Sequence, residues 1–238
     1  MIEFIRMKNN KTGFFAIMSI VLCFVLGLFL LITLDGYKLS EISLSTLQYS
    51  IYTVFSQFGF FILPVIAIHI ISNDYKEKNI SFYKSINENE ITYFIKKNFA
   101  LITYMSIGIV ISAIILAILY KNFSNILLFI LKLENVSIFI VLISSLIAFL
   151  FKNNIAAFCI NFGVWVLSVS LSAVHSIFKL LCFYDASLAR HSEFRKLLNS
   201  YRAFDNSILF EIAYNCIFLI IALGIIKIFK KRWIRNGI

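Results

Sequence analysis

Charge and proline are scarce in this 238-residue sequence, and both shortages restrict what the protein can be. Charged residues make up 14% of the chain, hydrophobic residues make up 61%, and there is a single proline. Soluble domains carry about a quarter of charged residues. Together with a mean hydropathy of +0.90, this composition excludes an ordinary soluble protein. It indicates one membrane domain over residues 1–238, without a low-complexity linker.

Several signatures of catalysis and metal binding are also missing. No glycine is followed by lysine, so the phosphate-binding GxxxxGK loop is absent, and no histidine is followed by glutamate, so a zinc-binding HExxH helix is absent. A GxSxG nucleophile turn, adjacent acidic residues and CxxC pairs are lacking as well. We therefore expect no enzyme activity, metal or cofactor in this chain.

Long apolar runs predict an all-α fold with six transmembrane helices. A helix rises about 1.5 Å per residue, so about 20 apolar residues cross the hydrocarbon layer. Such runs occupy residues 14–34, 51–72, 99–120, 136–151, 155–178 and 208–229. The fourth run extends backward through "NILLFILKLEN" if Lys132 snorkels to the interface, and "KNN" after it predicts a tight hairpin. Pro64 predicts a kink in the inner half of the second run.

Basic residues predict that both chain ends face the cytoplasm. An even number of spans places the two termini on one side of the membrane, and lysine and arginine are enriched on the cytoplasmic side. With the termini inside, fourteen of the 22 basic residues are cytoplasmic and eight are external. They collect beside span ends, which favours contact with anionic lipid of the cell membrane over nucleic-acid binding.

Polar residues within the apolar runs are candidates for a translocation path, because an uncompensated polar group in hydrocarbon is costly. Four of them share one stripe of the fifth span, and two are four residues apart in the sixth. The candidates are Gln57, Asn161, Ser168, Ser172, His175, Glu211 and Asn215. Glu211 is the strongest, since it is ionisable. The alternative is that these side chains only hydrogen-bond neighbouring helices.

The segment between the fifth and sixth spans, residues 179–207, contains a further helical pattern. After Ser192, apolar residues recur at helical spacing while charged residues fill the opposite face. This pattern predicts an amphipathic helix on the outer side. The helix either lies in the membrane interface or covers the protein itself.

Residues 72–100, between the second and third spans, carry nine charges that nearly cancel. Five lysines and four acidic residues are interleaved with Ile80, Phe82, Tyr83 and Ile86. A lipid-binding patch would carry one sign of charge. Mixed charges around apolar side chains are typical of a surface that docks on another protein.

These features together resemble the permease subunit of type-2 ABC exporters. They are the six spans, the cytoplasmic termini, the basic amphipathic start "MIEFIRMKNNK", a short helix in the inner loop and a long outer segment before the last span. The family's inner loop commonly has an acidic residue, Gly-Thr, an apolar stretch, then Pro and a basic residue. Here Asp74, Asn79-Ile80, "SFYKSI" and Lys96 or Lys97 occupy these positions, without the Gly, Thr and Pro. Small isoleucine-rich permeases of this kind are similar to exporters of antimicrobial or cytolytic peptides in Gram-positive bacteria, such as lantibiotic immunity and phenol-soluble modulin exporters.

The resemblance implies a coupling helix near residues 76–88, seated in a cleft of a separate cytoplasmic ABC ATPase that binds ATP and Mg²⁺. It also implies a second permease, identical or related, and export of an amphipathic peptide by alternating access. The coupling residues would be Asp74, Lys76, Glu77, Lys78, Phe82, Tyr83 and Lys84. Two other functions stay open: an ATP-independent membrane immunity or sensor protein, and an intramembrane enzyme. Only the exporter requires a partner on the inner loop.

Overall fold

The computed structural model describes residues 2–34, 36, 38, 42–174, 184, 194–198 and 206–237. Its regular elements are helical, as the composition predicts. They are α1 (Ile2–Asn9), α2 (Thr12–Thr33), α3 (Leu44–Gln57), α4 (Gly59–Lys76), α5 (Ile80–Ser85), α6 (Glu90–Leu119), α7 (Ile126–Leu150), α8 (Asn154–Val174), α10 (Asn206–Ile228) and α11 (Lys230–Gly237). Residues 194–198 form a further short helical turn.

The predicted membrane spans correspond to these long helices. α2, α6, α7, α8 and α10 are each long and apolar enough to cross a bilayer, and α3 with α4 makes a sixth span when the pair is taken as one helix bent by 52°. α7 includes the "ILLFILKLEN" segment, so the backward extension of the fourth span is confirmed. The hairpin between α7 and α8 is confirmed as well.

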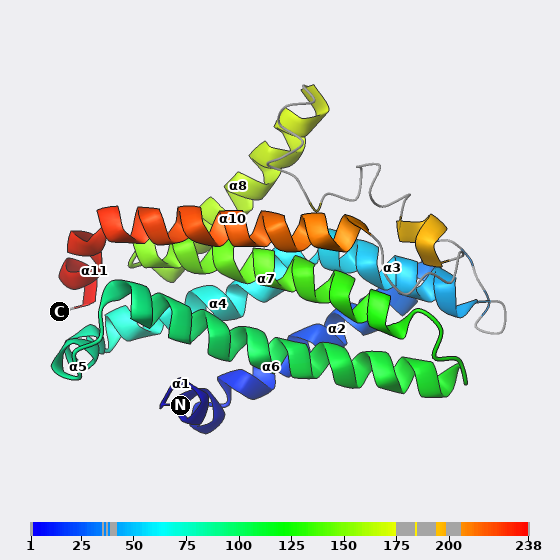
Figure 1. Cartoon of the computed structure of the whole chain (residues 1–238), viewed down its shortest axis with the longest axis horizontal. Helices are drawn as coiled ribbons and strands as arrows, with labels where there is room; N and C mark the ends of the chain where they lie inside the picture. The colour runs from blue at the N-terminus through cyan, green and yellow to red at the C-terminus, as the bar shows by residue number, and fades with distance from the viewer. Residues whose placement is uncertain are drawn as a thin grey trace.

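Both chain ends lie at the same end of the bundle, together with α5 and α11 (Figure 1). This placement agrees with an even number of spans. We call this end the inner end, following the charge-based prediction, and the opposite end the outer end. α7 lies at the centre and packs against α3, α4, α6, α8, α10 and α11, whereas the far half of α8 stands away from the other helices (Figure 1).

Small residues allow close packing of α2 against its neighbours. A Cβ atom added at Gly27 would lie 2.9 Å from the Ile51 Cα of α3, and one added at Gly108 of α6 would lie 3.3 Å from the Ile17 Cα. In lipid the hydrophobic effect does not drive helices together, so close van der Waals contact between their backbones is a main source of packing energy. These contacts fix α2 between α3 and α6.

The bend of the second span lies at Phe58 and Gly59, about one and a half turns before Pro64. Proline lacks an N–H group and its ring displaces the carbonyl four residues earlier, which here belongs to Phe60. The distortion therefore falls on the turn that precedes the proline. Gly59 at the bend packs against α7, where an added Cβ would lie 3.1 Å from the Ile140 Cδ1 atom.

The outer amphipathic helix is described only at residues 194–198. There Phe194 and Leu198 are buried while Arg195 and Lys196 are exposed, as the pattern predicts. Phe194 packs on Tyr52 of α3 with ring centroids 4.6 Å apart, and Asn125 Nδ2 donates to the Leu198 carbonyl at 2.7 Å. This turn covers the protein itself. The remainder of the predicted helix lies outside the described residues.

Candidate functional site

A buried cluster of charged and phenolic side chains joins four helices at the inner end. We call it the inner clamp, and it consists of Glu3 and Arg6 of α1, Asp74 of α4, Tyr83 of α5, and Tyr93 and Lys97 of α6. Asp74, Glu3 and Lys97 are each less than 5% exposed. Residues far apart in the sequence thus meet in one polar cluster, which fixes the position of α5.

Asp74 is the centre of the inner clamp because both of its oxygens are paired. Its Oδ1 lies 2.6 Å from Arg6 Nη2 and accepts from Asn79 Nδ2 at 3.2 Å. Its Oδ2 lies 2.7 Å from Lys97 Nζ and accepts from the Tyr93 hydroxyl at 2.9 Å. The carboxylate therefore ties the end of α4 to α1, to α6 and to the turn before α5.

Tyr83 connects the coupling segment to α1. Its hydroxyl donates to Glu3 Oε1 and accepts from Arg6 Nη1 at 2.8 Å, and Lys97 Nζ lies 2.7 Å from Glu3 Oε2. Burial raises the pKa of the Tyr83 phenol, and the negative charge of Asp74 raises it further. The hydroxyl therefore stays protonated at neutral pH and can donate to the carboxylate.

Two left-handed turns hold α5 between α4 and α6. Lys78 (φ 57°) closes α4 and Asn87 (φ 62°) closes α5. In each turn an amide beyond the left-handed residue returns to a carbonyl of the last helical turn: Asn79 N donates to Asp74 O at 2.9 Å, and Glu88 N donates to Tyr83 O at 2.9 Å. This pattern is the Schellman motif, so hydrogen bonds define the turn on each side of α5.

The predicted coupling residues divide into a buried and an exposed group. Asp74 and Tyr83 are buried in the inner clamp, so in this conformation they hold α5, and their role in coupling stays a prediction. The exposed group is Lys76, Glu77, Lys78, Phe82 and Lys84. Of these, Phe82 is 51% exposed although it is a large apolar side chain.

Several charges of the inner loop form pairs within the chain. Lys96 pairs with Glu88, Lys97 pairs with Asp74, and Glu90 Oε2 lies 3.5 Å from Lys230 Nζ of α11. Of the two adjacent lysines, Lys97 is thus the one that pairs with the acidic Asp74. Some of the charges within residues 72–100 therefore stabilise the fold of the inner end through ion pairs within the chain.

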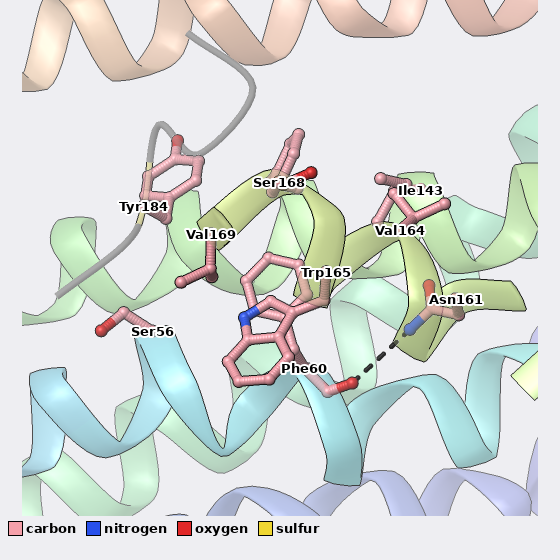
Figure 2. Close-up of a pocket in the computed structure, with 10 residues that line it drawn as sticks. Ser56, Phe60, Ile143, Asn161, Val164, Trp165, Ser168, Val169 and Tyr184 are labelled. Atoms are coloured by element: carbon pink, nitrogen blue, oxygen red, sulfur yellow. Dashed lines mark hydrogen bonds between the residues drawn. The ribbon is translucent and has the colours of Figure 1, made fainter. Parts of the chain in front are cut away.

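Two of the predicted path residues, Asn161 and Ser168, line one cavity between α3, α4, α7 and α8 (Figure 2). The cavity also contacts Phe60, Trp165 and Tyr184 and has a volume of about 20 Å³. That is room for one water molecule. This conformation therefore holds no peptide-sized space at that point.

Asn161 satisfies the carbonyl that Pro64 deprives of its helical partner. Its Nδ2 lies 3.5 Å from the Phe60 carbonyl oxygen, along the dashed line in Figure 2, and its Oδ1 accepts from Ser144 Oγ at 3.1 Å. Asn161 is 2% exposed. It therefore links α8 to the bent span and to α7, a packing role that the sequence left open.

The other predicted path residues do not join this cavity. Gln57 lines a separate groove of about 710 Å³ with Thr53 of the same helix, Leu30 of α2 and Arg195. His175 lies outside the described residues, as does the side chain of Ser172. The predicted stripe on the fifth span is thus described only for Asn161 and Ser168.

Glu211 and Asn215 face α7. Lys132 Nζ lies 2.6 Å from Glu211 Oε1 and donates to Ser207 Oγ at 2.8 Å. Asn215 Nδ2 donates to the Asn135 carbonyl at 3.0 Å. Lys132 and Glu211 are 3% and 2% exposed, so the prediction that Lys132 snorkels to the interface is wrong: it has a buried partner on α10.

Sequence reasoning missed the α1 half of the inner clamp and the partner of Glu211. Glu3 and Arg6 are three residues apart, hence on one helix face, but their positive neighbours suggested a lipid-facing segment. The signal for this pair was available, because a charged residue in an apolar span requires a partner. Lys132 in the extended fourth span has two acidic candidates in the sequence, Glu134 of the same span and Glu211 of the sixth.

Comparison with known proteins decides the family. The whole chain, residues 1–238, matches the peptide export permease protein YydJ family. The chain belongs to this family. It is also 29% identical over 240 residues to a Bacillus subtilis (strain 168) protein described as a "probable peptide export permease protein YydJ", covering 100% of this chain and 99% of the relative. No solved structure matches the chain.

Family membership confirms the resemblance to peptide-exporter permeases drawn from the sequence. Together with its apolar helices, it identifies a multi-pass protein of the cell membrane. The inner clamp and the exposed face of α5 are therefore features of a permease.

Proposed function

We propose that this chain is the membrane subunit of an ATP-driven ABC exporter of peptides. The observation that carries the proposal is α5: a short helix with an exposed aromatic side chain at the inner end, fastened to the spans through a buried charge cluster. A buried carboxylate, a lysine and an arginine hold α5 in place, and yet its large apolar side chain Phe82 faces water. Contacts within the chain do not explain this exposure. A partner that receives Phe82 accounts for both features.

The exposed face of α5 has the composition of a protein-docking surface. Phe82 is the apolar anchor, and Glu77, Lys78 and Lys84 surround it with charges of both signs. Buried aromatic side chains within a polar rim supply most of the energy in many interfaces. The partner would be a cytoplasmic ABC ATPase, which supplies ATP and Mg²⁺ sites, so that this chain needs no cofactor.

The inner clamp provides a route for motion from α5 to the spans. Asp74 connects the turn before α5 to α1 and α6, and Tyr83 connects α5 itself to α1. When the ATPases close, displacement of α5 would therefore move α1, α4 and α6 as one body. Two permeases, identical or related, would then rock between inward and outward openings in a rigid-body scheme.

An apolar groove between α2 and α4 supports a peptide with an apolar face as the substrate. It has a volume of about 710 Å³ and is lined mainly by Phe15, Met18, Leu22, Phe61 and Val65. The groove reaches His69 and Asn10 near the inner end. An amphipathic peptide would enter it laterally from the inner leaflet, and the peptide-export description of the family agrees with such a substrate.

The test is the ATP hydrolysis rate of the cognate ATPase, measured with the permease in nanodiscs. We expect wild-type permease to bind the ATPase and stimulate it, and Phe82→Ala to weaken binding by about tenfold, the loss typical of an interface anchor. The matched control is Phe123→Ala, which removes an exposed phenylalanine at the outer end and should leave binding unchanged. A permease that never associates with an ATPase, or a Phe82→Ala variant with normal stimulation and export, would refute the proposal.

A further inference from the structure

The last helix, α11, carries charge of a single sign. It contains four basic residues and no acidic residue, and a fifth basic residue stands in the last turn of α10 just before it: Lys230, Lys231, Arg232 and Arg235, preceded by Lys227. The inner loop next to it has mixed charges that nearly cancel. The mixed charges of the inner loop suit a protein partner. The basic cluster of α11 suits anionic lipid, because clusters of one positive sign beside a span attract it.

The opposite face of α11 is docked on the protein. Trp233 is 1% exposed and packs on Tyr93 of α6 with ring centroids 5.6 Å apart. Lys230 Nζ lies 3.5 Å from Glu90 Oε2, and Arg232 Nη1 donates to the Leu150 carbonyl of α7 at 3.4 Å. α11 also packs against α4 and α5.

The position of α11 places its free charges at the depth of lipid headgroups. α10 has 23 residues, about 35 Å of helix, which is enough to cross the hydrocarbon layer. α11 begins two residues after α10 ends, and in Figure 1 it turns across the inner end of the bundle. Lys231 and Arg235 of α11 remain exposed, as does Lys227 in the last turn of α10. They thus lie where the anionic headgroups of the inner leaflet begin.

We propose that the exposed basic face of α11 binds anionic phospholipid headgroups of the inner leaflet, and that this binding holds α11 against α6. The consequence reaches the inner clamp, because Tyr93, on which Trp233 packs, donates its hydroxyl to Asp74 Oδ2. Anionic lipid would therefore stabilise the position of α5. Any effect on export rests on the proposed function, whereas lipid binding by α11 does not.

The two tryptophans of the chain, Trp165 and Trp233, make the proposal measurable without an ATPase. In a Trp165→Phe protein, all tryptophan fluorescence comes from Trp233, on the docked face of α11. The full chain is placed in nanodiscs of phosphatidylcholine alone or with phosphatidylglycerol, and quenching by neutral acrylamide is recorded. We expect the quenching constant to fall by about twofold with the anionic lipid, and to rise again at high salt, which screens surface charge.

Charge-reversal variants assign the effect to α11. Lys231→Glu with Arg235→Glu should abolish the lipid dependence, while Lys121→Glu, an exposed lysine at the outer end, should preserve it. Inorganic phosphate added to phosphatidylcholine nanodiscs should not replace the lipid. Equal quenching in both lipids, or lipid dependence that survives the double reversal, overturns the proposal. So does a double reversal that abolishes ATPase binding in detergent and leaves the lipid effect intact, because the surface then belongs to a protein partner.

Discussion

At the scale of single residues, burial separates charges that hold the fold from charges that face solvent. Lys96 and Lys97 are adjacent, yet the Lys97 side chain is 4% exposed with two carboxylate partners, whereas the Lys96 side chain is 49% exposed with one. Removing one partner from a buried ion pair leaves an uncompensated charge in a medium of low polarity. Two neighbouring lysines should therefore differ widely in importance.

This difference can be tested by thermal unfolding in detergent. We expect Lys97→Met to lower the free energy of unfolding by about 3 to 5 kcal/mol, because Asp74 and Glu3 lose their buried partner. Lys96→Met should cost less than about 1 kcal/mol, as exposed pairs do. Similar losses for the two variants would show that the inner clamp does not carry the stability assigned to it.

The pair between Lys132 and Glu211 gives a second prediction at this scale. Glu211→Gln alone should destabilise the protein by about 3 kcal/mol or more, because Lys132 stays buried without its counter-charge. Lys132→Met combined with Glu211→Met removes both charges and should recover most of that loss. The measurement is the unfolding temperature of each variant in detergent, compared with that of the wild-type protein.

The double variant also separates packing from transport. If the double variant were as unstable as Glu211→Gln, the unpaired charge of Lys132 would not be the cause of the lost stability. Recovered stability without recovered export would place Glu211 in the translocation path, as the sequence suggested.

At the scale of elements, the bent span and α8 depend on each other. Pro64 leaves the Phe60 carbonyl without a helical donor, and Asn161 of α8 supplies one. α8 is otherwise the least buried of the spans, since only 11% of its apolar window is buried. Pro64 thus creates the unpaired carbonyl group that helps to fix α8.

A double-mutant cycle tests this dependence. Asn161→Leu should cost on the order of 0.6 to 2 kcal/mol, the range for hydrogen bonds between helices in a membrane. In a Pro64→Ala background the backbone N–H returns, so the Phe60 carbonyl has a partner and the same substitution should cost less. Independent, additive losses would mean that Asn161 does not compensate for the proline.

At the scale of the whole molecule, the sequence predicted the spans, the hairpin and the shared side of the termini, because hydrocarbon forces each apolar run into a helix of fixed length. The inner clamp was not predictable in the same way. Glu3 and Asp74 meet only after α1, α4 and α6 have packed, and no local spacing records that contact. Asp74 and Tyr83 are consequently buried by contacts that the sequence does not reveal, while Phe82, whose environment is local to α5, remains an exposed candidate.

The whole-molecule claim is that α5 seats in a soluble ATPase. Photo-crosslinking tests it most directly: benzoylphenylalanine is placed at position 82, and at position 123 of the outer end as the control, in membranes that contain the cognate ATPase. We predict a covalent product with the ATPase from position 82 and none from position 123. Absence of an ATPase product at position 82, under conditions where the two subunits are both present and the permease is folded, would contradict the claim.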